Sequence, residues 1–98
     1  MKKLDLDKYL EAYTYSYKLH KKQTRKGSNI PYFTHLSSVS NLIIENNGTT
    51  TQAIAGLLHD AVEDQGGAKT LAAIKRKFGP KVAKIVDQCS DTTIKPKP

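Results

Sequence analysis

The stretch "LLHDAVED", residues 57–64, places a histidine and three acids directly after an apolar run. The acids are Asp60, Glu63 and Asp64, in a chain of 98 residues with 16 Lys and Arg, 9 Asp and Glu, and a formal net charge of +7. No Lys or Arg lies in residues 46–67 to balance them. On a helix, like charges three or four residues apart cost roughly 0.2–0.5 kcal/mol per pair. A polar face that simply meets water does not explain this crowding.

The rest of the chain has apolar residues at helical spacing, and no segment has the pattern of a strand. The predicted helices span about residues 6–22, 31–47, 49–65, 70–78 and 80–91. Thr49 followed by Gln52 predicts a capping box at the start of the third helix, which carries the acidic stretch without a break. Residues 92–98 have no pattern and are predicted to be a loop or a frayed end. The sequence therefore predicts one all-α domain over residues 1–98, a bundle of about five helices.

The same spacing predicts which side of each helix is buried. For the first helix the predicted residues are Leu6, Leu10, Tyr13 and Tyr17; for the second they are Leu36, Val39 and Ile43; for the last they are Val82, Ile85, Val86 and Cys89. His20 continues the stripe of the first helix. We therefore interpret it as a partly buried, hydrogen-bonded histidine in preference to a metal ligand.

Composition limits the class of protein. No stretch approaches the roughly 18–20 apolar residues of a membrane span, and the single cysteine cannot form an internal disulfide, which favours the cytoplasm. The basic excess favours an anionic partner such as a nucleotide or a nucleic acid. It is concentrated in residues 18–26, which hold five positive charges and no acid. The alternative is a solvated basic helix end. No aromatic stacking platform is evident, so nucleic acid is the less favoured partner.

A bound cation would explain the crowded acids of the opening stretch. Neutral imidazole together with carboxylate suits Mn, Fe or Zn. His59 and Asp60 are adjacent in sequence, so their side chains should diverge on a helix and another helix must supply a ligand. His35, at the start of the second predicted helix, is the best donor available. The spacing therefore predicts a metal site that includes His35, His59 and Asp60.

Three motifs in order carry a resemblance to a known family. They are "RKGSNIPYFTH" at residues 25–35, "AIAGLLHDAVED" at residues 53–64 and "FGPKVAKIVDQCSDT" at residues 78–92. Together they resemble the HD superfamily of metal-dependent phosphohydrolases. More closely, they are similar to the hydrolase domain of the RelA/SpoT homologues and their small stand-alone relatives. These enzymes remove pyrophosphate from the 3′ position of guanosine tetra- and pentaphosphate, usually with Mn²⁺.

The resemblance implies a role for each matching residue. His35, His59 and Asp60 match the metal ligands of the family. Glu63 and Asp64 match the acidic pair that activates or positions the attacking water. Arg25 and Lys26 match the basic pair that holds the nucleotide.

The chain departs from the family in one respect. The family has a further aspartate ligand on a later helix, and the sequence ends at Pro98 before a matching stretch. The resemblance thus implies the N-terminal portion of the full domain, with Asp87 and Asp91 as the only acids after Asp64. It also implies apolar surface left uncovered on the third and fifth predicted helices, and therefore a homo-oligomer. The alternative function is a truncated, non-catalytic relative that binds a nucleotide or a partner.

Overall fold

The computed structural model describes residues 3–94, without the side chains of residues 64 and 90–94. Within this range the chain is all-α, as the sequence predicted. The helices are α1 (Leu6–His20), α2 (Tyr32–Glu45), α3 (Thr50–Leu58), α4 (Ala61–Asp64), α5 (Gly67–Phe78) and α6 (Pro80–Ile94). Five are long, and α4 is a single turn. None of these helices in the described range is long and apolar enough to cross a membrane.

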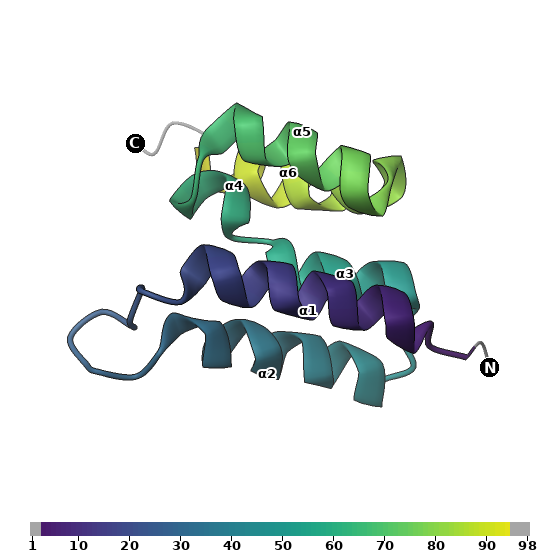
Figure 1. Cartoon of the computed structure of the whole chain (residues 1–98), viewed down its shortest axis with the longest axis horizontal. Coiled ribbons are helices and arrows are strands. Elements are labelled where there is room, and N and C mark those ends of the chain that lie inside the picture. The colour runs from purple at the N-terminus through teal and green to yellow at the C-terminus, as the bar shows by residue number, and fades with distance from the viewer. Residues whose placement is uncertain (1–2, 95–98) are drawn as a thin grey trace.

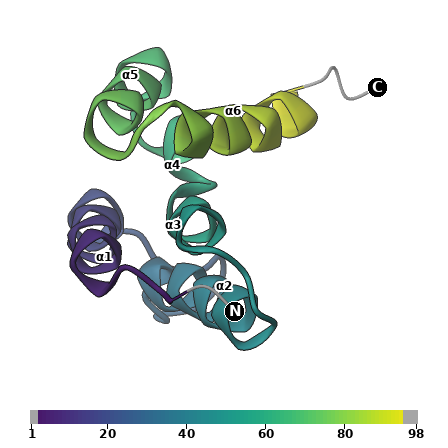
Figure 2. The same ribbon diagram turned by 90° about the vertical axis from the view of Figure 1, so that its right-hand side faces the viewer.

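Helix α3 lies at the centre of the bundle. It contacts α1, α2 and α6, and α5 pairs with α6 as a hairpin. In Figure 2, α1 and α2 lie on one side of α3, and the α5–α6 hairpin lies on the other. The chain therefore runs from one layer to the other through the short α3–α4 connection, which is visible in Figure 1.

The sequence of α3 explains its central position, because every residue from 53 to 58 is buried. Several of these residues are small, so neighbouring backbones come close. A Cβ atom on Gly56 would lie 2.7 Å from Cδ1 of Ile43 on α2. The buried Ser40 hydroxyl on α2 donates to the carbonyl of Ala53 at 2.7 Å. The predicted capping box of Thr49 and Gln52 is present and fixes where α3 begins.

The predicted buried face of α1 is wrong for three of its four residues. Leu6, Leu10 and Tyr17 are 68%, 61% and 48% exposed. The fully buried residues of α1 are instead small or polar: Ala12, Ser16 and His20. Close packing against α3 requires this face, because the Ser16 hydroxyl donates to the carbonyl of Leu57 at 2.8 Å. A polar residue with a buried partner has no signature in an apolar pattern.

The two C-terminal helices follow the prediction with shifted ends. Helix α5 begins at Gly67, ahead of the predicted cap Thr70, whose hydroxyl donates to the carbonyl of Gln65. Val82 and Val86 of α6 are buried as predicted. Helix α6 extends to Ile94, three residues into the segment that was predicted to be a loop. The remaining residues of that segment, 95–98, lie outside the described range.

Candidate metal centre

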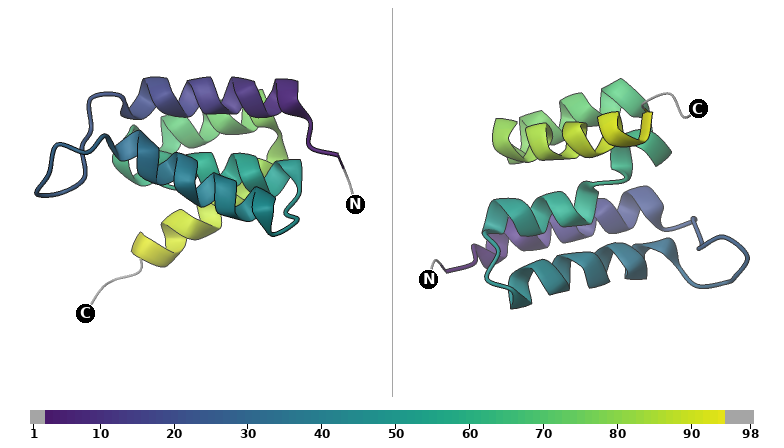
Figure 3. Two further views of the ribbon diagram at one scale, coloured as in Figure 1. Left: turned by 90° about the horizontal axis from the view of Figure 1, so that it is seen from below. Right: turned by 180° about the vertical axis from the view of Figure 1, so that it is seen from behind.

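A hairpin-like loop positions the first turn of α2 and with it His35. The backbone N–H of Arg25 donates to the carbonyl of Ile30 at 2.8 Å, and that of Tyr32 donates to the carbonyl of Gln23 at 2.8 Å. The loop projects past the ends of α1 and α2 (Figure 3). Pro31 is the N-cap residue of α2, with φ −60° and ψ 133°, so the chain enters the helix from an extended conformation.

The third helix breaks between α3 and α4, at His59 and Asp60, where the sequence predicted continuity. Asp60 has φ −99° and ψ 0°, outside the helical region. The Nδ1 atom of His59 bonds to the carbonyl of Gly56 at 2.7 Å, so the side chain folds back along the end of α3. Because of this break, the prediction that the side chains of His59 and Asp60 diverge is wrong. His59 Nε2 lies 3.3 Å from Asp60 Oδ2.

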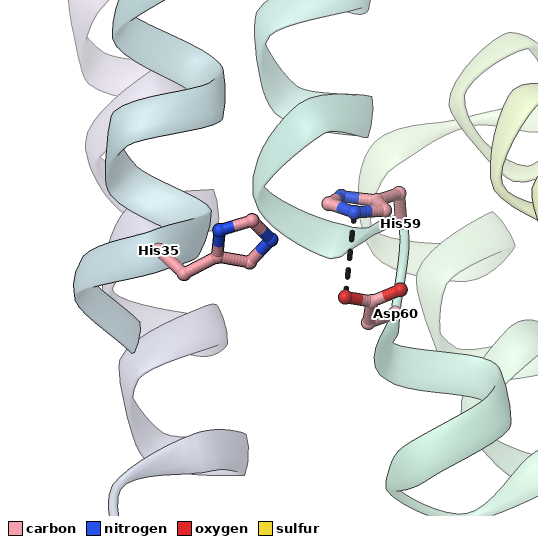
Figure 4. Close-up of side chains that lie close together, drawn as sticks. All are labelled: His35, His59 and Asp60. Carbon is pink, nitrogen blue, oxygen red and sulfur yellow. Dashed lines mark ion pairs between the residues drawn. The ribbon is translucent and has the colours of Figure 1, made fainter. Parts of the chain in front are cut away.

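His35, His59 and Asp60 come together as the sequence predicted from their types. Each offers one ligand atom, and these atoms lie within 4.8 Å of one another. Figure 4 shows the ring of His35 on α2 with its outer nitrogen directed toward His59 across the gap between the helices. All three side chains are partly buried. The cluster thus joins α2 to the α3–α4 connection.

The hydrogen bond to Gly56 fixes the tautomer of His59. A carbonyl only accepts, so Nδ1 of His59 carries a hydrogen. Nε2 of the neutral ring then directs a lone pair at the Asp60 carboxylate 3.3 Å away. Two acceptors at this distance repel unless a proton or a metal ion lies between them. A ligating histidine whose other nitrogen donates to a carbonyl is the usual arrangement in metal sites.

The surroundings of His35 favour its neutral form. Burial lowers the pKa of His35 below its ordinary value, and the positive charge of Arg25 and the neighbouring His59 lower it further, while Asp60 opposes them. Arg25 Nη1 lies 3.5 Å from His35 Nδ1. A guanidinium can only donate, so this contact holds the hydrogen of neutral His35 on Nε2. Coordination through Nε2 would require the hydrogen on Nδ1 and would release Arg25 from the ring.

These residues fit a divalent first-row metal ion. Two imidazoles and a carboxylate are a common ligand set for Mn, Fe or Zn. Ligand bonds of about 2.0–2.2 Å place two ligand atoms about 3.4 Å apart in tetrahedral coordination, and about 4.2 Å apart only when the two lie on opposite sides of the ion. The ligand atoms of the cluster lie within 4.8 Å of one another, so binding needs the widest pair to close by about 0.5–1.5 Å through side-chain rotation. Three protein ligands also leave positions open for water and substrate, as catalytic sites require.

Among the side chains that the structure describes, the other predicted residues lie outside this cluster. Glu63 is exposed on α4, one turn after Asp60. Lys26 is exposed in the loop beside Arg25. Asp87 lines a separate groove with Lys84. The side chains of Asp64 and Asp91 lie outside those that the structure describes.

Sequence reasoning missed Tyr32, the first residue of α2. Its hydroxyl donates a hydrogen bond to Oδ2 of Asp60, the oxygen that faces His59. The two residues are 28 positions apart, and nothing in the type or spacing of a single tyrosine pointed to this contact. His20, by contrast, is buried and bonded through Nδ1 to Gln23 Oε1 at 2.9 Å, as predicted.

The chain is similar to known proteins that belong to one family or act on guanosine nucleotides. A protein-family model described as "HD domain" matches residues 12–97. The chain is 33% identical over 91 residues to human guanosine-3′,5′-bis(diphosphate) 3′-pyrophosphohydrolase MESH1, a match of 90% of this chain and 50% of that protein. It is 39% identical over 83 residues to a GTP pyrophosphokinase of Myxococcus xanthus, a match of 85% of this chain and 11% of that protein.

A probable GTP pyrophosphokinase of Mycobacterium leprae is 41% identical over 68 residues, which is 69% of this chain and 8% of that protein. The chain thus spans half the length of MESH1 and a small part of the two larger proteins. The family match covers most of the chain and includes all three residues that could hold a metal ion, His35, His59 and Asp60. The chain belongs to the HD domain family.

Proposed function

We propose that this chain is a metal-dependent phosphohydrolase that removes pyrophosphate from the 3′ position of guanosine-3′,5′-bis(diphosphate). The observation that supports it most is the convergence of His35, His59 and Asp60, with Arg25 beside His35. The printed name of MESH1 supports the substrate class. Mn²⁺ is the proposed metal, in keeping with the ligand set. A cytoplasmic location stays a prediction from the sequence.

The proposed roles divide binding from proton transfer. A bound divalent ion would supply a water of lowered pKa and would withdraw charge from the phosphoryl oxygens. Arg25, once released from His35, would bind a substrate phosphate through charge-assisted hydrogen bonds, and Lys26 would add a second cation from the same loop. Glu63 or Asp64 would accept or relay the proton of the attacking water as a positioned general base.

The experiment measures pyrophosphate release from guanosine-3′,5′-bis(diphosphate) by the 98-residue chain with Mn²⁺, and with EDTA as control. We expect release that depends on the metal. Glu63→Gln combined with Asp64→Asn should lower the rate by about 10²–10⁴-fold, the usual contribution of a general base. Mn²⁺ binding without any release would overturn the proposed hydrolysis, and an unchanged rate in the double variant would overturn the role of the acidic pair.

The alternative is a non-catalytic module that binds the nucleotide or a partner. It is favoured by one observation, since Glu63 is exposed and lies outside the metal cluster of the described residues. Binding of the nucleotide with no pyrophosphate release would support this alternative.

Self-association through uncovered apolar surface also stays a prediction. A groove of about 670 Å³ lies between α2, α3 and α6, and Val39, Ile43 and Ile85 contribute to its lining. Apolar surface of this kind often marks an association site. Sedimentation equilibrium would test it, and a monomer at all concentrations would contradict it.

Metal affinity should fall as the pH decreases through the pKa of His35, which lies below the ordinary histidine value of about 6.5. The ligand must be neutral, and the lowered pKa of His35 delays its protonation to lower pH. The metal-free fold should lose stability in the same direction, because the unfolded chain takes up the proton first. Arg25→Gln removes a charge that lowers this pKa, so the fall in Mn²⁺ affinity should move to higher pH. Titration calorimetry across pH measures both curves, and coincident curves would contradict the role of Arg25.

A further inference from the structure

The hydroxyl of Tyr32 contacts the oxygen of Asp60 that faces the metal cluster. Tyr32 Oη donates a hydrogen bond to Asp60 Oδ2. The same Oδ2 lies 3.3 Å from Nε2 of His59. The carboxylate of an aspartate rotates about the Cβ–Cγ bond unless a contact holds it. The hydrogen bond from Tyr32 therefore determines where Oδ2 lies. Oδ2 can still offer a lone pair to an ion held between His35 and His59.

Tyr32 is itself held from several sides. Its backbone N–H donates to the carbonyl of Gln23 at 2.8 Å, which fixes the start of α2. Its ring packs between two histidines, with centroids 5.5 Å from His20 and 5.5 Å from His35. His20 is fully buried, and its Nδ1 bonds to Gln23 Oε1 at 2.9 Å. Gln65, just after α4, donates to the same oxygen at 2.9 Å.

The ring and the hydroxyl of Tyr32 therefore act on different ligands. The ring contacts His35, and the hydroxyl holds Asp60, so one side chain touches ligands from both sides of the gap between α2 and the α3–α4 connection. Groups that hydrogen-bond to ligating carboxylates orient them and tune the metal site.

We propose that Tyr32 is a positioning residue of the metal centre, which holds Asp60 Oδ2 in the orientation that coordination needs. This inference rests on the proposed metal site but not on hydrolysis. Removing the hydroxyl leaves the carboxylate free to rotate before the metal binds. The affinity for the metal should then fall by about 10–100-fold, the usual effect of losing a group that orients a ligand.

The test compares Mn²⁺ affinity in the full chain and in Tyr32→Phe, by titration calorimetry or by the electron paramagnetic resonance of free Mn²⁺. Tyr32→Phe keeps the ring and its contacts with the histidines, so the variant keeps the fold. Tyr13→Phe is the matched control, because it too removes a single tyrosine hydroxyl. The Tyr13 hydroxyl joins α1 to α2 through Ser37 Oγ at 3.2 Å and does not contact the cluster. The thermal midpoint of each protein is measured in EDTA.

We expect weaker Mn²⁺ binding in Tyr32→Phe, unchanged binding in Tyr13→Phe, and similar metal-free midpoints for the two variants. A purely structural role would lower the metal-free midpoint of Tyr32→Phe and leave the affinity of the folded protein unchanged, which would overturn the inference. Equal affinity in all three proteins would overturn it as well while leaving the metal site intact. A wild-type chain that binds no Mn²⁺ would overturn the proposed function and this inference together.

Discussion

Leu58→Ala should lower the free energy of unfolding by about 2–5 kcal/mol, the range for deleting a buried leucine side chain. Leu58 is fully buried in the core and is the last residue of α3, directly before His59. A domain of this size has a total stability of about 5–15 kcal/mol, so the loss is a large fraction of it. Urea denaturation followed by circular dichroism in EDTA measures the change without any contribution from bound metal.

Leu10→Ala is the matched control, since it deletes the same side chain from the exposed face of α1. We expect a change within about 0.5 kcal/mol, as for most surface substitutions. Similar losses in the two variants would contradict the assignment of the core. A loss of stability in Leu10→Ala alone would support the sequence prediction that Leu10 lies on the buried side of the first helix.

Asp60→Asn should raise the dissociation constant for Mn²⁺ by at least about 100-fold, the upper end of the effect of losing a group that only orients a ligand. The substitution keeps the size of the side chain and replaces a charged carboxylate by a neutral amide. Hard divalent ions bind a carboxylate more strongly than an amide. An acceptor for the Tyr32 hydroxyl remains. Titration calorimetry with Mn²⁺ measures the change, and pyrophosphate release should disappear in parallel.

Asp87→Asn is the matched control for charge. Asp87 is a partly buried acid on α6 in a groove away from the cluster, so its neutralisation removes the same charge from a different place. We expect nearly unchanged Mn²⁺ affinity. An equal loss in both variants would mean that net charge, and not a ligand, explains the effect.

Much of the helical fold could be predicted from the sequence, because local signals specify it. The Thr49–Gln52 capping box, Pro80 in the first turn of α6 and the glycine after α5 act within a few residues of themselves. The apolar pattern also found the buried Leu36 and Val86. On α1 the burial of His20 was predicted, but Ala12 and Ser16 were missed, because one is small and the other enters the core through a hydrogen bond to the distant carbonyl of Leu57.

The site could be predicted by residue type but not by geometry. His35, His59 and Asp60 were identified from their chemistry, and the structure brings them within reach of one ion. The break between α3 and α4 could not be predicted, because the contacts there depend on tertiary structure. The bond that the Tyr32 hydroxyl donates to Asp60 joins residues 28 positions apart, and it accompanies the local bond from His59 to Gly56. Without the break, the two ligands would point in different directions.

The most direct test of the metal centre is a crystal of the chain grown with Mn²⁺ and measured for anomalous scattering. The account predicts one strong peak at about 2.0–2.3 Å from Nε2 of His59, from Oδ2 of Asp60 and from a ring nitrogen of His35. A fully occupied peak elsewhere, or none between these three side chains at saturating Mn²⁺, would contradict it.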